Sequence, residues 1–149
     1  MPKPSHQIVM LVVAILVGCG TNSAVDPTRP KIEMQEVQAP MVATTGPFDI
    51  QYQIAIENPS SQPITLKKLQ LTTTGDGFYS LRRDPYYFDQ TIPPGSSGLV
   101  TFWAHAYANY YPGTSKATMP VSIRAVAIFN APNGSFQQVF TTLIPQFNE

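Results

Sequence analysis

The stretch FDIQYQIAIE, from Phe48 to Glu57, alternates apolar and polar side chains along its whole length. Successive side chains of a β-strand point to opposite faces of the sheet, so this period of two predicts a strand with one face in a core. The inward set is Phe48, Ile50, Tyr52, Ile54 and Ile56. The turn-forming cluster Asn58-Pro59-Ser60-Ser61 follows at once and ends the strand.

The next apolar run, Ile64–Thr73, changes phase in its middle. Ile64 and Leu66 fall on one face, whereas Leu69 and Leu71 fall on the other, with Lys67-Lys68 between the two pairs. One inserted residue resets which face points inward. The sequence therefore predicts a strand with a β-bulge at these two lysines.

The rest of the chain continues as short strands. Leu99–Ala108 carries Leu99, Thr101, Trp103, His105 and Tyr107 on one face and Val100, Phe102, Ala104 and Ala106 on the other. We expect it to be a central strand with both faces partly covered. Val121–Phe129 alternates and is followed, across Asn130-Ala131-Pro132-Asn133-Gly134, by Phe136–Ile144, which predicts a hairpin.

Two further segments complete the set of strands. Ile32–Val42 contains Pro40, and a proline inside a strand favours an edge position. A short strand is expected near Gly77–Leu81 or Tyr86–Phe88. About seven strands with a turn every eight to fifteen residues or so indicate an antiparallel β-sandwich of the immunoglobulin or fibronectin type III kind. A closed eight-stranded barrel is the alternative.

Composition excludes several classes of protein. Nine Lys and Arg balance nine Asp and Glu, so the chain has no basic stripe of the kind that binds nucleic acid by releasing counterions. Hydrophobic residues make up 43% and charged residues 12%, which argues against general disorder. A single Cys rules out an internal disulfide.

The first residues form a secretory signal pattern. Lys3 precedes the wholly apolar run Ile8–Val17, and small residues follow it. About ten apolar residues span roughly 15 Å as a helix, too short for a bilayer that needs about twenty. Leu16-Val17-Gly18-Cys19 resembles the lipobox of bacterial lipoproteins.

This resemblance implies a lipid anchor. It places the signal cleavage between Gly18 and Cys19, and it implies diacylglyceryl and further acyl (palmitate-type) modification of Cys19, whose several chains hold a protein firmly on a membrane. The expected organisation is a signal peptide over residues 1–18, the lipidated Cys and a flexible linker over 19–30, and a β-sandwich domain over 31–149. Because Gly20 rather than Asp follows the Cys, the resemblance implies the periplasmic face of the outer membrane in a host with two membranes.

Two turn motifs carry a second resemblance. The segment Ile54–Leu66, with its Asn58-Pro59 turn, is similar to the strand–turn–strand unit of late-embryogenesis-abundant type 2 domains. Ile92-Pro93-Pro94-Gly95-Ser96 is similar to the segment that leads into a strand in many bacterial immunoglobulin-like modules. Both families consist chiefly of binding or structural modules, so the resemblance implies no active site.

Few residues are available for catalysis. His105 is the one His after the signal, no Gly-x-Ser-x-Gly elbow accompanies it, and Cys19 is assigned to lipid, so we expect His105 to be a structural strand residue. No transition-metal site of several His and Cys can be assembled, and no cofactor is expected. The loop carboxylates Asp76, Asp84 and Asp89 leave two alternatives open, a small envelope hydrolase and a calcium site.

Aromatic loops are the candidate binding feature. Tyr and Arg are the residue types enriched at interface hot spots, because they combine large contact area with polar groups. The candidate partner-binding residues are Tyr79, Arg82, Arg83, Tyr86, Tyr87, Tyr110 and Tyr111. In the alternative interpretation, the aromatic side chains cap the ends of the core. We therefore expect a non-catalytic, lipid-anchored envelope module with a protein or glycan partner, or an accessory subunit of a secretion, pilus or efflux assembly that pairs an edge strand.

Overall fold

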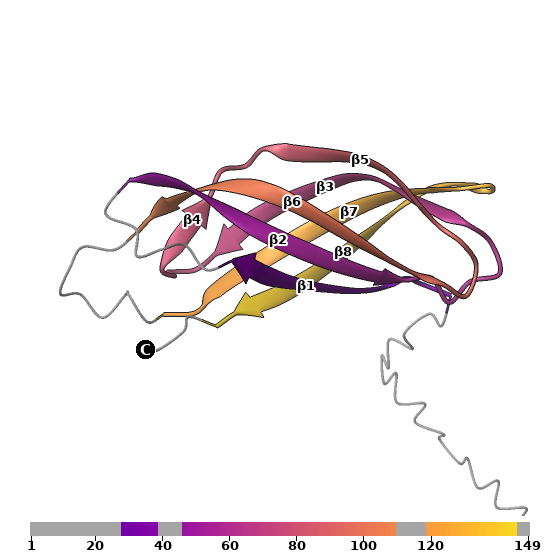
Figure 1. The fold of residues 1–149 in the computed structure, drawn as a ribbon, viewed down its shortest axis with the longest axis horizontal. Helices are drawn as coiled ribbons and strands as arrows, with labels where there is room; N and C mark the ends of the chain where they lie inside the picture. Colours follow the sequence, from indigo (N-terminus) through magenta and orange to yellow (C-terminus); the bar gives the residue numbers. More distant parts are fainter. Residues whose placement is uncertain (1–27, 39–45, 110–118, 146–149) are drawn as a thin grey trace, which may run out of the picture.

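The computed structural model describes residues 28–38, 46–109 and 119–145, and these residues form eight β-strands and no helix (Figure 1). Accordingly, no described helix could cross a membrane. The predicted signal peptide and Cys19 lie outside the described residues. The strands are β1 (Lys31–Gln38), β2 (Pro47–Glu57), β3 (Ile64–Thr74), β4 (Tyr79–Leu81), β5 (Pro85–Ile92), β6 (Ser97–Ala108), β7 (Val121–Ala131) and β8 (Gly134–Ile144).

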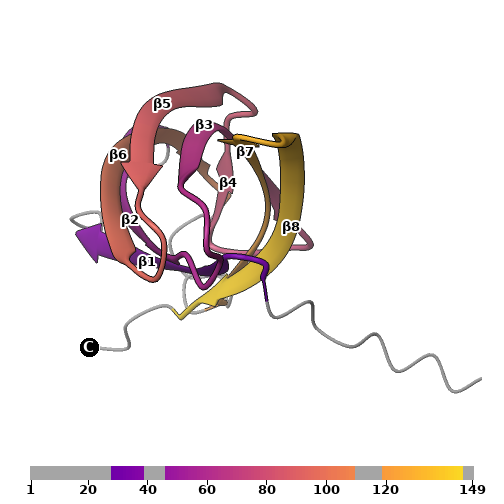
Figure 2. The same ribbon diagram turned by 90° about the vertical axis from the view of Figure 1, so that its right-hand side faces the viewer.

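The strands form two antiparallel four-stranded sheets. Sheet A has the order β1-β2-β6-β4, and sheet B has the order β5-β3-β7-β8. Seen along the long axis, the sheets curve around a shared interior (Figure 2). Because they remain two separate sheets, the predicted β-sandwich is confirmed and the closed barrel is wrong.

The inward faces follow the predicted alternation. On β2, Ile50, Tyr52, Ile54 and Ile56 are buried, and the inward face of β7 is buried from Val121 to Phe129. The predicted bulge is also present, since the pairing of β3 with both neighbours shifts between Leu66 and Lys68. The bulge turns Leu69 and Leu71 into the same core as Ile64 and Leu66.

Strand positions agree with the sequence, with one more strand than expected. β6 lies between β2 and β4, so it is central, and β1 is an edge strand, although Pro40 itself lies outside the described residues. The two segments offered as alternatives for a short strand both form strands, β4 and β5. β5 extends to Ile92 because it pairs with β3 on both sides of the bulge.

One buried amide joins two loops at the end of the sandwich where the described chain begins. The Asn58 side chain is fully buried, and its Nδ2 contacts the carbonyl oxygens of Gln62, Ile92 and Pro93 at 2.8, 3.1 and 3.2 Å. Its Oδ1 accepts hydrogen bonds from the backbone N and the Oγ of Ser60 at 3.1 and 2.7 Å. The two turn motifs singled out in the sequence are therefore one structural unit.

Backbone hydrogen bonds reinforce this unit. Asn58 N donates to Ser96 O at 2.8 Å, and Gly95 N donates to Asn58 O at 2.9 Å. Gly95 has a φ of 64°, a left-handed conformation that glycine adopts without a steric cost. The loop before β6 is thereby fixed to the end of β2, which sets where β6 starts.

Candidate functional site

The predicted partner-binding residues are not gathered on one surface. Tyr79 was a candidate partner-binding residue, and this candidate is wrong, since Tyr79 is 1% exposed on the inward face of β4. Its ring packs edge-on against Phe48 and Phe78, with centroids 5.9 and 6.2 Å away. Tyr79 therefore belongs to the core, as the capping interpretation proposed.

Tyr86 and Tyr87 face opposite ways because they are neighbours on β5. The Tyr86 ring packs against Phe102 in the interior, at 4.8 Å between centroids, and burial raises the pKa of its phenol. Tyr87 is 72% exposed and lies beneath the Lys68 ammonium, 5.8 Å from the ring centroid. Tyr86 therefore belongs to the core, and only Tyr87 of the two is accessible to a partner.

The two arginines lie in the exposed turn between β4 and β5. The Arg82 Nε is 3.2 Å from Asp84 Oδ2, an ion pair within the turn, and Arg83 is exposed. Tyr110 and Tyr111 lie outside the described residues. Of the seven predicted residues, Arg82, Arg83 and Tyr87 are exposed, on two different elements.

A chain of hydrogen-bonded oxygens, from the buried Tyr52 and Tyr79 hydroxyls to the partly buried Glu36 carboxylate, was not anticipated from the sequence. The Tyr79 hydroxyl donates to Glu36 Oε2 at 3.3 Å and also bonds the Tyr52 hydroxyl. Desolvation raises the pKa of all three groups, most strongly for the two phenols. Alternation on β2 places Tyr52 inward, and alternation on β1 places Glu36 on the same face as Ile32 and Met34, so this signal was present in the sequence. A small cavity of about 310 Å³ beside Glu36 is bordered by the ends of β1 and β8.

The candidate catalytic and calcium residues have separate partners. His105 Nδ1 contacts Asp49 Oδ1 on the solvent face of sheet A, as expected of a surface strand residue. Asp84 pairs with Arg82, and Asp89 pairs with Lys67. The described part of the chain contains no group of three or more His, Cys, Asp or Glu able to hold a metal ion.

The most distinctive surface is the outer face of β6, which the sequence predicted to be partly covered. That prediction is wrong: Leu99, Trp103 and Tyr107 are 64%, 51% and 49% exposed, while the opposite face of β6 is buried. No described element packs over this face, because sheet B covers the inner face of sheet A. We call Leu99, Thr101, Trp103, His105 and Tyr107, with the β2 residues opposite them, the β6 stripe.

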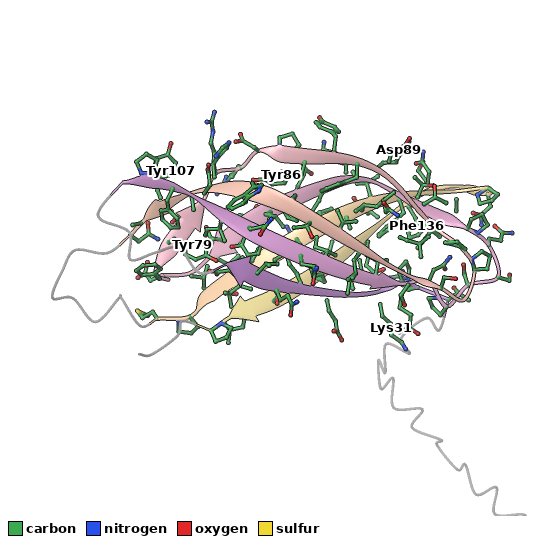
Figure 3. All side chains as sticks on the ribbon, viewed as in Figure 1. Lys31, Tyr79, Tyr86, Asp89, Tyr107 and Phe136 are labelled. Carbon is green, nitrogen blue, oxygen red and sulfur yellow. The ribbon has the colours of Figure 1, made fainter. Side chains whose placement is uncertain are left out.

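The stripe runs along the long axis of the sandwich. In Figure 3, Tyr107 lies near one end and Lys31, beside the start of β6, near the other. Eight residues separate Leu99 from Tyr107 on this strand, about 26 Å at the usual rise per residue. The sequence signal for this surface was a strand with large apolar side chains on both faces. The same pattern is typical of a strand that is covered on both sides, so it could not show that one face is exposed.

A second concave surface lies at the end where the described chain begins. A groove of about 510 Å³ is bordered by Arg29, Pro30, the Ser60–Gln62 turn and the β7–β8 hairpin, with Phe136 on its wall. Its border is mostly hydroxyls, amides and backbone, and no titratable cluster lies within it.

Comparison with known proteins identifies the fold and no family. Neither a protein-family model nor a curated protein matches the sequence. The structure is similar to that of a Northeast Structural Genomics Consortium target, with a TM-score of 0.52, 14% identity and coverage of 83% of this chain and 90% of that one. It is also similar to a protein from Archaeoglobus fulgidus, with a TM-score of 0.51, 12% identity and coverage of 80% and 96%. At these identities the likeness shows a shared fold and nothing further.

Proposed function

We propose that this chain is a lipid-anchored, non-catalytic binding module of the cell envelope, and that the β6 stripe is its binding surface. The observation that carries the binding role is the row of Leu99, Trp103 and Tyr107 on the outer face of sheet A, which no described element covers. Exposed Trp and Tyr have few rotatable bonds and supply contact area at little entropic cost. The anchor is supported by Leu16-Val17-Gly18-Cys19 and by the short apolar run before it.

The position of the described N-terminus is compatible with such an anchor. Nine residues separate Cys19 from Thr28, where the described chain begins, and an extended chain of that length reaches about 30 Å. The module would thus be held close to the membrane, at the end of the sandwich that carries the Asn58 loops.

The anchor is tested by Cys19→Ser in the full chain expressed in a bacterial host. We expect the parent protein to incorporate a palmitate analogue and to fractionate with membranes at the mass of a cleaved, acylated chain. The variant should lose the label and the cleavage at Gly18. A variant that keeps the parental mass and label would contradict the anchor.

The binding role is tested by co-sedimentation with envelopes of the organism that encodes the chain. The full chain carrying Cys19→Ser serves as background, so that acyl chains make no contribution. Trp103→Ala should reduce sedimentation, whereas Leu143→Ala, which removes a side chain 62% exposed on sheet B, should not. Equal sedimentation of the two variants would refute the assignment of the stripe.

A further inference from the structure

We infer that the β6 stripe binds an uncharged polysaccharide chain of the cell envelope. This inference rests on the proposed function and names its ligand class. It is argued from the order of side chains along the stripe, from the amides beside Trp103, and from the distribution of charge over the face.

Apolar and hydrogen-bonding positions alternate along the stripe. Between Leu99, Trp103 and Tyr107, which point outward, stand Thr101 and His105 on the same face. Residues directly opposite one another on antiparallel strands share a face, so the stripe also includes the β2 partners. These pairs are Leu99 with Ala55, Thr101 with Gln53, Trp103 with Gln51, His105 with Asp49, and Tyr107 with Pro47.

The centre of the stripe is a set of amides around one indole. Gln51 lies opposite Trp103, and Gln53 lies in the next row of outward side chains. Gln35 Nε2 of β1 donates to Gln53 Oε1 at 3.0 Å, which holds these two amides in place. Each carboxamide has two donor hydrogens and two acceptor lone pairs, so the pair keeps donor and acceptor capacity beyond this one bond.

A sugar ring matches this combination. It presents an apolar face of C–H groups, which can lie flat on an aromatic ring, and an edge of hydroxyls that both donate and accept hydrogen bonds. Aromatic side chains at Trp103 and Tyr107, with amides and a hydroxyl between the rows, offer both kinds of contact to one extended chain. The stripe follows one strand, so it suits a linear polymer.

The same features disfavour the other occupants. The core of a protein interface, or of a dimer of this chain, is depleted in charged groups, whereas the Asp49 carboxylate, in contact with His105, lies within the stripe. An anionic membrane surface would need cations. The sheet A outer face instead carries the carboxylates of Glu33, Asp49 and Glu57, and Lys31 is paired with Glu57 at 3.3 Å. These carboxylates would also repel an acidic polysaccharide, whereas they do not repel an uncharged one.

The test uses five preparations of the same envelopes: untreated, digested with protease, extracted with organic solvent to remove lipid, oxidised with periodate to open sugar rings that carry vicinal hydroxyls, and digested with glycoside hydrolases (lysozyme among them) that cut the amino-sugar chains periodate leaves intact. The full chain carrying Cys19→Ser is compared with the same chain carrying Trp103→Ala, and with Leu143→Ala as the exposed control. We expect Trp103-dependent sedimentation to survive protease and lipid extraction and to be lost after periodate or after the glycoside hydrolases. The apparent affinity of the Trp103→Ala variant should fall about tenfold or more, as for an aromatic hot spot.

The outcomes separate this inference from the proposed function. Trp103-dependent sedimentation that disappears after protease or after lipid extraction would overturn the polysaccharide and keep the binding module. Survival after both periodate and the glycoside hydrolases would also overturn the polysaccharide. Absence of Trp103-dependent sedimentation with untreated envelopes would refute the binding role itself. Sedimentation equilibrium of the variants would detect a dimer formed through the stripe, and loss of dimer on Trp103→Ala would replace the polysaccharide by a second copy. A thermal midpoint equal to that of the parent shows that Trp103→Ala is folded.

Discussion

Replacing Asn58 by Ala should be among the most damaging changes of a polar residue in this domain. The substitution removes the amide that joins the loop after β2 to the loop before β6, and all of that amide is buried. Five contacts of hydrogen-bond length are lost: three from Nδ2 to carbonyl oxygens and two to Oδ1. At a net worth of about 1 kcal/mol for each hydrogen bond, the upper figure is about 5 kcal/mol.

Two features of the structure reduce that figure. The amide has two hydrogens, which are shared among three carbonyls. The carbonyl of Gln62 also accepts from Ser60 Oγ at 2.8 Å, and the carbonyl of Pro93 also accepts from Ser96 N at 3.2 Å, so neither is left without a donor. We therefore expect Asn58→Ala to lower the free energy of unfolding by about 2–4 kcal/mol. For a domain of this size the melting temperature should fall by roughly 8–16 °C.

Urea and thermal unfolding followed by far-UV circular dichroism measure this loss. Trp103 is half exposed and is therefore a poor fluorescence reporter of the core. Asn133→Ala, in the exposed turn of the β7–β8 hairpin, is the matched control and should change stability by less than about 0.5 kcal/mol. Asn58→Asp should cost more than Asn58→Ala, because it places a carboxylate against three carbonyl oxygens in the interior. A loss in Asn58→Ala no larger than in the control would refute the reasoning.

Two further predictions concern the core and the partly buried carboxylate of Glu36. A Cβ at Gly98 would lie 2.8 Å from Ile92 Cγ1, so Gly98→Ala should destabilise the fold by about 1–3 kcal/mol. Ile92→Ala removes that atom, so it should cost less stability in the Gly98→Ala background than in the parent protein. Strictly additive losses of unfolding free energy in urea titrations would contradict a clash between the two side chains. Burial raises the pKa of Glu36 above its ordinary 4.5, so the folded state binds the carboxyl proton more tightly than the unfolded state does. The protonated carboxyl therefore stabilises the fold at low pH, and this stabilisation is lost as pH rises from about 4.5 through the folded-state pKa. In unfolding measurements across pH, Glu36→Gln should abolish this loss of stability, whereas Glu33→Gln at an exposed position should leave it unchanged. An equal dependence of the free energy of unfolding on pH in the two variants would count against a desolvated Glu36.

The strands were predictable because their signals are local. Alternation over ten residues marks β2, the phase change at Lys67-Lys68 marks the bulge, and Asn130–Gly134 marks the hairpin. Each pattern depends on the geometry of one strand or one turn, which is the same in any sheet. The count of strands was less accurate, because β4 spans three residues and is stabilised by pairing with β6 rather than by its own sequence.

The binding surface was predicted poorly because exposure is not local. Aromatic residues near Pro and Arg suggested an exposed loop, but Tyr79 and Tyr86 lie on the inward faces of β4 and β5, which also form strands. Trp103 was read as partly covered because its strand is apolar on both faces. Covering a face requires a second layer, and whether a layer exists depends on chain segments far away in the sequence.

The sequence by itself determined an all-β chain, the inward and outward residues of its long strands, the bulge, the edge position of β1, and the lipobox pattern at Cys19. These follow from side-chain period and turn chemistry, which act over a few residues. The tertiary structure alone decided that Asn58 joins two distant loops, that the Tyr52 and Tyr79 hydroxyls share a chain of hydrogen bonds with the partly buried Glu36, and that no described element covers the β6 stripe. Each of these is a relation between residues dozens of positions apart, set by how two sheets pack face to face, and no local pattern encodes it.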